Sequence, residues 1–227
     1  MNSIFTGAMI GDEHTLRDWG SAITNSDVIS MPEAKTVLLE VPGRCGRLDL
    51  SEVLTGDVAY GNREIKLKLA AKTNREKWVE TCYHIFNKYH GRMVQVTFDE
   101  DPGHYYVGRA TISDPQRVAS AGQLSINIDA EPFRYEQDLY EETFTGSTTA
   151  VSGTVRNLRM PVCPTVTVPG ACQLFHDDKV YELKSGTQEV PGLVLHSFDN
   201  EISVTGVKSI MVPAIQTTSS KTIVNMV

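Results

Sequence analysis

Val41-Pro42-Gly43-Arg44-Cys45-Gly46-Arg47-Leu48-Asp49 forms the centre of the segment that decides the fold, which runs from Pro32 to Leu69. An apolar stretch enters a Pro-Gly turn, a long excursion follows, and Gly61-Asn62 opens a second strand near Arg63. This order predicts an extended β-arm. Such an arm leaves rows of backbone N–H and C=O groups unpaired, and it is typical of a segment that pairs with a partner.

The rest of the first half has two kinds of periodic pattern. Alternation of apolar and polar residues predicts strands over 65–69, 94–98 and 124–128, and the turn residues from Asp99 to Gly103 predict a hairpin joining 93–98 to 105–112. A helical period predicts a helix over 74–90, with a capping box at Thr73 and Glu76 and a stop at Gly91. Its expected buried face consists of Trp78, Cys82, Ile85, Phe86 and Tyr89.

The composition changes after Phe133. The stretch from Phe144 to Thr154 is mostly Gly, Ser and Thr, which predicts a linker or an exposed connection. Short β-prone runs follow at 165–168, 172–175, 179–183, 193–196, 202–205 and 208–212, broken by turn residues. The chain is therefore predicted to be mainly β, with an N-terminal β-sandwich or barrel over 1–133 that carries one α-helix and the arm, and a C-terminal jelly-roll β-sandwich over 134–227.

Charge and composition exclude several functional classes. The net charge of −7 divides into −4 before Phe133 and −3 after it. Since the sequence has no basic stripe that could contact phosphates, specific nucleic-acid binding is not predicted. No signal-like start and no apolar run long enough for a membrane span is present, which predicts synthesis in the cytoplasm and no membrane partner. Four cysteines without paired spacing, Cys45, Cys82, Cys163 and Cys172, are expected to be reduced core thiols.

Motifs for catalysis or metal binding are missing from the sequence. It has no nucleophile elbow, no zinc-protease helix motif and no phosphate-binding glycine loop, so no catalytic residue, metal site or cofactor is predicted. The acids Asp99, Glu100 and Asp101 lack calcium-loop spacing and are interpreted as a solvated turn. Cys163, Cys172 and His176 do not have the spacing of a zinc site.

Several short motifs, in their order along the chain, resemble the distal tail proteins of phages, the Dit family. These motifs are Asp18-Trp19-Gly20, the arm sequence from Val41 to Asp49, Tyr60 with Asn62-Arg63, Tyr89-His90-Gly91, Asp101-Pro102 before Tyr105-Tyr106-Val107-Gly108-Arg109, and Asp129-Ala130-Glu131-Pro132-Phe133. The resemblance covers most of the chain.

Membership of this family would imply a structural virion protein. The N-terminal domains would form a ring, expected to be a hexamer, that joins the tail tube to the tail tip or baseplate and leaves a channel for DNA. The implied partners are the tail tube protein and a tail-associated tip protein, with a receptor-binding protein as a further candidate. The implied location is the distal end of the tail after assembly in the host cytoplasm. The C-terminal sandwich would be galectin-like. The predicted subunit interface is the arm with its following strand: Pro42, Gly43, Arg44, Gly46, Arg47, Asp49, Tyr60, Asn62 and Arg63.

Two alternatives remain open on the sequence. A carbohydrate-binding or adhesin module is one, although the second domain has no Trp and only Phe175, Tyr181 and Phe198 after the expected linker to stack on sugar rings. A baseplate or tube protein of a contractile tail is the other.

For the arm itself, the simpler structural interpretation is an ordinary hairpin that folds back on its own sheet.

Overall fold

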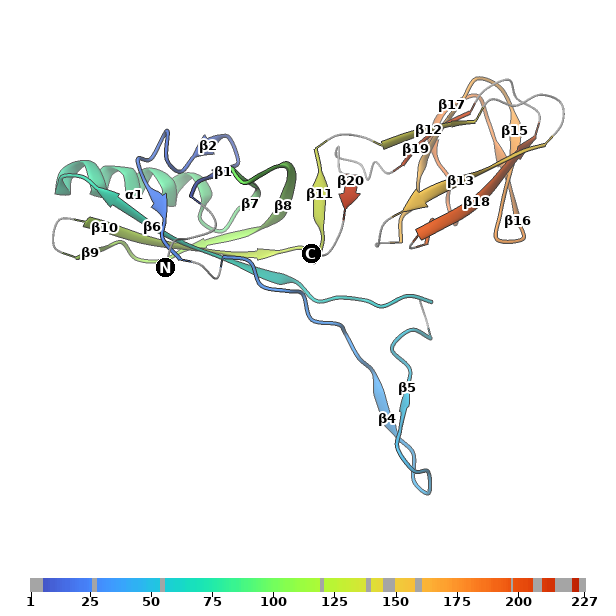
Figure 1. The fold of residues 1–227 in the computed structure, drawn as a ribbon, viewed down its shortest axis with the longest axis horizontal. Helices are drawn as coiled ribbons and strands as arrows, with labels where there is room; N and C mark the ends of the chain where they lie inside the picture. Colours follow the sequence, from blue (N-terminus) through green and yellow to red (C-terminus); the bar gives the residue numbers. More distant parts are fainter. Residues whose placement is uncertain are drawn as a thin grey trace. The chain divides into compact units, whose positions relative to one another are not determined.

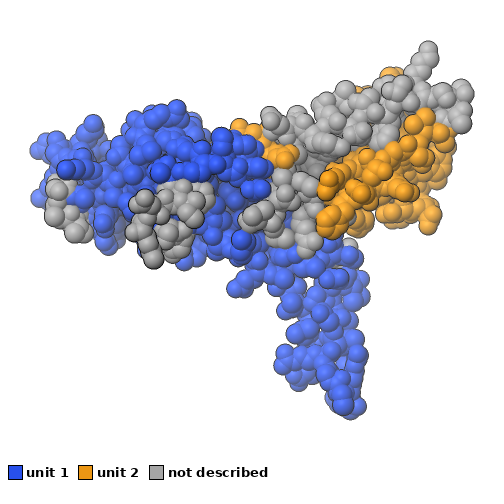
Figure 2. Space-filling model, in the orientation of Figure 1, with its two compact units in different colours: residues 1–134, 227 blue, residues 135–226 orange. Residues whose placement is uncertain are grey.

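The chain divides into two compact units, residues 1–134 and 135–226, which are blue and orange in Figure 2. The computed structural model describes residues 6–25, 28–53, 56–118, 121–137, 140–144, 150–157, 161–196, 198–205, 210–214 and 222–224. Each unit is described here by itself. Figure 1 labels the elements along the chain.

Unit 1 is built on one antiparallel sheet with the strand order β2-β1-β7-β8-β10-β6-β3, and β9 pairs with the far end of β10. The two longest neighbours, β6 and β10, pair along their whole length, so alternate residues from both strands enter one core. The elements are β1 (Ala8–Ile10), β2 (Glu13–His14), β3 (Ala22–Ile23), β6 (Arg63–Lys72), α1 (Arg75–Tyr89), β7 (Met93–Phe98), β8 (Asp101–Ile112), β9 (Gln116–Val118) and β10 (Ala121–Ala130).

Helix α1 packs against β8 and β10 and closes the core of unit 1. Trp78, Cys82, Ile85 and Tyr89 are buried as the period predicts, whereas Phe86 is 45% exposed and stacks on the ring of His90. The predicted capping box is wrong by one residue. Asn74 is the N-cap, and its side chain accepts a hydrogen bond from the backbone N–H of Lys77, so the third helical position holds Lys77 instead of a glutamate.

The predicted strands of unit 1 are confirmed, with one change at the acidic turn. β8 already begins at Asp101, so the turn is limited to Asp99 and Glu100. The three acids there also bind neighbours instead of water alone: Asp99 lies 2.8 Å from His14 Nε2, Glu100 accepts from Thr6, and Asp101 pairs with Arg134.

Unit 2 consists of two four-stranded antiparallel sheets, β12-β19-β14-β17 and β13-β18-β15-β16. Both sheets bury alternate residues, among them Val166, Leu174 and Ile202, which gives a layered all-β unit. The short strands β11 and β20 pair with each other and belong to neither of these two sheets. The elements are β11 (Arg134–Glu136), β12 (Tyr140–Phe144), β13 (Val151–Asn157), β14 (Thr165–Val168), β15 (Cys172–His176), β16 (Lys179–Leu183), β17 (Gly186–Glu189), β18 (Phe198–Thr205), β19 (Ile210–Ala214) and β20 (Thr222–Val224).

The mainly β class is confirmed, but the linker or exposed connection predicted at Phe144–Thr154 is wrong at both of its ends. Phe144 closes β12, and Val151 to Thr154 begin β13, which pairs with β18 over seven residues. The intervening residues 145–149 lie outside the described part of the chain. Within that part, no helix has the length and apolar character that crossing a bilayer requires.

Candidate assembly surface

The predicted arm is a hairpin with its own two-stranded sheet, β4 (Leu38–Glu40) and β5 (Arg47–Asp49), which projects from unit 1 in Figures 1 and 2. Its register pairs Leu39 with Leu48. Gly43 and Gly46 have φ values of +82° and +79°, a left-handed conformation that glycine adopts without the steric cost of a Cβ atom. The turn that the Pro-Gly motif predicts is therefore present at the arm's tip.

The arm exposes apolar side chains that its own chain leaves uncovered. Leu38 and Leu39 are consecutive residues of one strand, so they point to opposite faces, and they are 47% and 49% exposed. A two-stranded hairpin is at best marginally stable alone in water, and exposed apolar edges promote pairing with another chain. Both faces of the arm are therefore available for a partner. The other exposed apolar residues of this region are Met31, Val37, Val41 and Val53.

Most of the predicted interface residues lie on this hairpin. Pro42, Gly43, Arg44 and Gly46 form the tip, where the backbone N–H of Arg44 donates to the carbonyl of Val41 at 3.1 Å. Cys45 is exposed in the same turn, so the expectation of four core thiols is wrong for this residue, although Cys82 and Cys172 are buried.

Two of the predicted interface residues, Arg47 and Asp49, have partners within the arm. Arg47 Nε donates to Glu40 Oε1 at 3.2 Å, and Asp49 accepts from the hydroxyl and the N–H of Ser51. The Ser51 hydrogen bonds lower the pKa of Asp49 from its ordinary value. Because the Arg47 and Glu40 side chains are well exposed, their pairing shapes the arm more than it stabilises the fold.

The arm joins the sheet through a ladder of backbone contacts. Ala34 and Tyr60 form a bridge, and the N–H of Gly61 donates to the carbonyl of Glu33 at 2.8 Å. Tyr60 is half-buried and meets the ring of Phe133 edge to face. Asn62 is exposed, whereas Arg63, which begins β6, is buried in unit 1. Arg63 thus lies at the foot of the arm and differs in environment from the other predicted residues.

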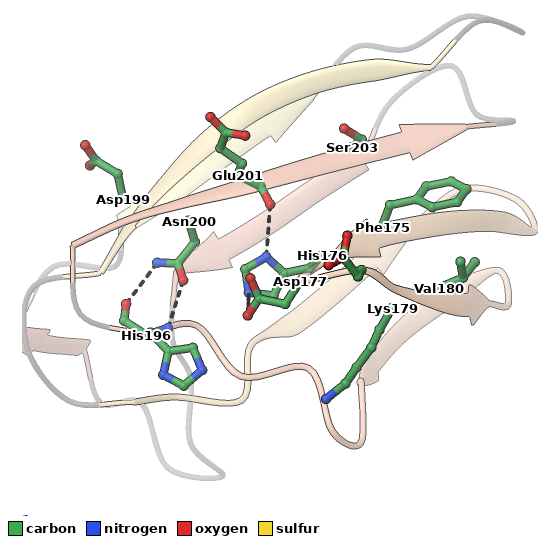
Figure 3. A pocket seen from close by; sticks show the side chains of 11 residues that line it. Phe175, His176, Asp177, Lys179, Val180, His196, Asp199, Asn200, Glu201 and Ser203 are labelled. Atoms are coloured by element: carbon green, nitrogen blue, oxygen red, sulfur yellow. Dashed lines mark hydrogen bonds and ion pairs between the residues drawn. The ribbon is translucent and has the colours of Figure 1, made fainter. Parts of the chain in front are cut away.

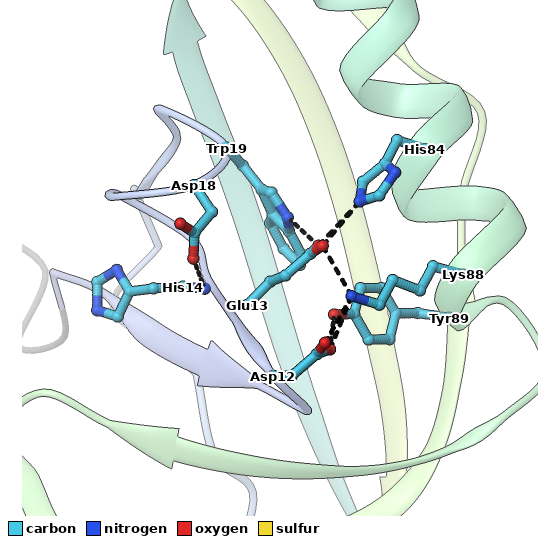
Figure 4. A network of polar contacts seen from close by, with 8 residues as sticks. All are labelled: Asp12, Glu13, His14, Asp18, Trp19, His84, Lys88 and Tyr89. Carbon is cyan, nitrogen blue, oxygen red and sulfur yellow. Dashed lines mark hydrogen bonds and ion pairs between the residues drawn. The ribbon is translucent and has the colours of Figure 1, made fainter.

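A polar network that the sequence analysis missed holds the β1–β2 turn to helix α1 (Figure 4). Glu13 accepts hydrogen bonds from Lys88 Nζ, His84 Nε2 and Trp19 Nε1, each at 2.8 Å. Asp12 accepts from Lys88 Nζ and from the hydroxyl of Tyr89, each at 2.9 Å. The partners lie more than 70 residues apart in the sequence except for Trp19, so no local motif announces the network.

The electrostatics of this network indicate a structural clamp. Burial raises the pKa of Glu13, but the donors Lys88, Trp19 and His84 outweigh it and lower the pKa to about 2. Hydrogen bonds to Asp12 and Glu13 raise the pKa of Lys88. A general acid or base works best with a pKa near the operating pH, so these shifts move both groups away from proton transfer at neutral pH.

The clamp predicts an acid dependence of stability. The pKa of Glu13 is lowered from 4.5 to about 2 in the folded chain, so its stabilisation is complete above about pH 4.5 and is lost as the pH falls toward 2. Solvent screening keeps the stabilisation below the roughly 3 kcal/mol that the full shift represents, because the partner His84 is half exposed. Urea unfolding followed by tryptophan fluorescence reports unit 1 alone, because Trp19 and Trp78 are the chain's only tryptophans.

Glu13→Gln is expected to lower the urea midpoint at pH 7 and to flatten its fall between pH 4.5 and 2.5. Glu80→Gln, an exposed position on α1, is the matched control and should behave as the wild type. Equal pH profiles for Glu13→Gln and the wild type would mean that the clamp does not hold the fold.

Unit 2 contains an open cavity of about 800 Å³ between the β15–β16 turn and the start of β18 (Figure 3). Several polar groups in its wall are already paired. His176 Nδ1 lies 2.9 Å from the carbonyl oxygen of Glu201, and its Nε2 lies 3.1 Å from that of Val194. Asn200 accepts from the N–H of His196 and donates to its carbonyl. The contact of His176 with Glu201 joins β15 to β18, and the other contacts hold the segment before β18. The described residues contain no group of three or more potential metal ligands.

Comparison with known proteins identifies a solved structure with the same fold. The Dit protein (gp 19.1) of phage SPP1, described as a paradigm of the hub adsorption apparatus in phages that infect Gram-positive bacteria, matches with a TM-score of 0.63 and 15% sequence identity. The match covers 93% of this chain and 98% of that chain. No family model matches, and no curated protein matches. The resemblance to distal tail proteins is therefore confirmed at the level of the fold.

Proposed function

We propose that this chain is a structural protein of a phage tail and forms the hub at its distal end. The observation that carries the proposal is the fold shared with SPP1 Dit over nearly the whole of both chains. Shared fold does not by itself fix function, so the arm supplies the second support, because assembly requires an unsatisfied surface and the arm has one on each face.

The finer form of the proposal is a ring. A contact in which the arm of one copy lies on a different surface of the next is heterologous, and heterologous contacts close into rings when the rotation closes. We propose a hexamer that joins the tail tube to the tail tip and is assembled in the host cytoplasm. We propose that this contact is made by the predicted interface residues, which are Pro42, Gly43, Arg44, Gly46, Arg47 and Asp49 on the arm and Tyr60, Asn62 and Arg63 at its foot.

A passive channel for DNA accords with the charge of the chain. Proteins that retain DNA gain affinity from lysine and arginine side chains that release counterions from phosphates. Unit 1 carries more acidic than basic residues, and the whole chain has a net charge of −7. A ring of such subunits is suited to let DNA pass without binding it.

The proposal predicts that the arm is needed for assembly and not for folding. Replacing residues 37–57 by a short Gly-Ser turn is expected to give folded monomers, since Lys35 and Ala59 already meet through a backbone hydrogen bond at the arm's base. Light scattering after size-exclusion chromatography measures the mass, and circular dichroism checks the fold.

A point variant with a matched control makes the test sharper. Leu39→Glu places a charge on the arm and is expected to weaken assembly strongly. Met93→Glu makes the same change at a residue of similar exposure, 52%, outside the arm and should assemble as the wild type. An oligomer that survives removal of the arm would overturn the proposed role of this hairpin.

A further inference from the structure

Arg63 is an unusual residue because it is a buried cation that no carboxylate of the described residues pairs with. The residue is only 1% exposed, and within the described part of the chain none of its three guanidinium nitrogens makes a hydrogen bond of good geometry, although the polar Tyr106 lies beside it. The guanidinium instead lies over the ring of Tyr106, 5.3 Å from the centroid. A buried charge that is neither paired nor hydrogen-bonded costs several kcal/mol, and a native structure that retains one requires an explanation.

The sheet is shaped to carry this side chain inward. Arg63 lies on β6 and Tyr106 on β8, so the side chain crosses the intervening strand β10. In the register of the sheet, Arg63 lies beside Ala130, and Ala130 lies beside Gly108. Two small residues therefore form the floor beneath the guanidinium, and Gly108 packs so closely against β10 that a Cβ atom there would clash with that strand.

The surroundings of Arg63 have an excess of positive charge. Arg134 Nη1 donates to Asp101 Oδ2 at 3.0 Å, but Arg134 Nε is buried without a partner. His104 Nδ1 also lies 2.5 Å from Asp101. Burial lowers the pKa of Arg63, and the charge of Arg134 lowers it further, so the two cations repel each other across this site. Apart from His104, the cluster holds two permanent cations and one carboxylate.

We propose that Arg63 and Arg134 form a receptor for one carboxylate group, which a second copy of this chain supplies in the assembled ring. A carboxylate would satisfy the planar guanidinium of Arg63 with two parallel hydrogen bonds and would balance the charge of the cluster. The Tyr106 ring and the small floor orient the guanidinium for this contact. Arg63 itself is closed to solvent, so the carboxylate has to enter from the side of Asp101, whose side chain is 33% exposed.

The position of the receptor favours a second copy as the source. Arg63 follows the arm directly in the sequence, so a neighbour that contacts the arm lies close to the arm's foot. Every copy also offers exposed carboxylates, among them Glu33, Glu40 and Glu52. The inference thus rests on the proposed assembly for the source of the carboxylate, but not for the receptor itself.

Sodium acetate is the probe for the receptor in the full chain. The thermal midpoint of unit 1, followed by tryptophan fluorescence in chloride and in acetate at equal ionic strength and pH 7, is expected to rise with acetate in the wild type. Arg63→Met should lose this rise and should be as stable as the wild type in chloride, or more stable, because it removes an unpaired charge. Arg75→Met, at an exposed position on α1, should keep the rise.

Two results would overturn the receptor. One is an acetate response that is the same in the wild type and in Arg63→Met. The other is a large loss of stability for Arg63→Met in chloride, which would show that the guanidinium is already satisfied within its own chain.

Assembly tests the source of the carboxylate separately. Light scattering as a function of concentration is expected to show that Arg63→Met weakens assembly by at least about tenfold, while Arg75→Met does not. Normal assembly by a variant that has lost the acetate response would overturn the second copy as the source. An Arg63-dependent acetate response in a chain that stays monomeric would support the receptor and overturn the proposed ring.

Discussion

Trp78→Ala is expected to lower the free energy of unfolding of unit 1 by about 3–5 kcal/mol, the usual cost of removing a buried large aromatic side chain. Trp78 is 3% exposed and lies on the inner face of α1. Among the described residues its indole N–H has no hydrogen-bond partner, so packing rather than hydrogen bonding supplies its contribution. Urea unfolding followed by the remaining tryptophan, Trp19, measures the change. Tyr83→Ala, at a 67% exposed position on the same helix, is the control and should cost little.

The contact of Trp78 with Gly122 on β10 gives this prediction a second test. A Cβ atom at Gly122 would overlap the indole ring, so Gly122→Ala should destabilise the wild type. In the Trp78→Ala background, the methyl group added by Gly122→Ala enters the space that the indole ring has left. There Gly122→Ala should lower the free energy of unfolding less than in the wild type, or raise it. Additive effects of the two substitutions would contradict this packing.

The helix illustrates what periodicity can and cannot predict. The spacing of Trp78, Cys82 and Ile85 places them on one face, and that face is buried. The same period also includes Phe86, which lies at the edge of the face and remains on the surface. Sequence spacing predicts the direction in which a helical side chain points. It does not predict how much of the helix surface the neighbouring strands cover.

In unit 2, the composition of a segment predicted its strands less well than the alternation of polar and apolar residues. The runs at 165–168 and 179–183 coincide with β14 and β16, and β14 alternates half-buried and buried residues with a strand's period. The Gly, Ser and Thr residues at the start of β13 give no such signal. Their strand forms because β18 offers a full backbone ladder, a partner that lies nearly 50 residues away.

The candidate assembly surface was predictable where its signals are local. Pro42, Gly43 and Gly46 specify the turn of the arm, and the structure has it there. The environment of Arg63 was not predictable, because it depends on Tyr106 and Arg134, which reach it through the register of three strands. Long-range contacts of this kind leave no trace in the local sequence.

Gly108→Ala is expected to lower the free energy of unfolding of unit 1 by about 3 kcal/mol, the upper end of the usual range for overpacking. Gly108 lies in the middle of β8 between β7 and β10. A Cβ atom there would lie 2.5 Å from the carbonyl oxygen of Asp129 and 2.6 Å from the Cα atom of Ala130. Both are backbone atoms of β10, so the clash can be relieved only by moving one central strand away from the other.

The sign of the change separates this close approach from ordinary strand propensity. Alanine in a strand interior is normally more stable than glycine by roughly 0.5–1 kcal/mol, because glycine loses more backbone entropy on folding. Gly103→Ala tests that expectation on the same strand, where a Cβ atom would meet nothing within 4 Å, and it should be neutral or stabilising. Urea unfolding by tryptophan fluorescence compares the two variants. If Gly108→Ala were as stable as Gly103→Ala, β8 and β10 would not lie as close as the register places them, and the floor beneath Arg63 would be wider than its two small residues imply.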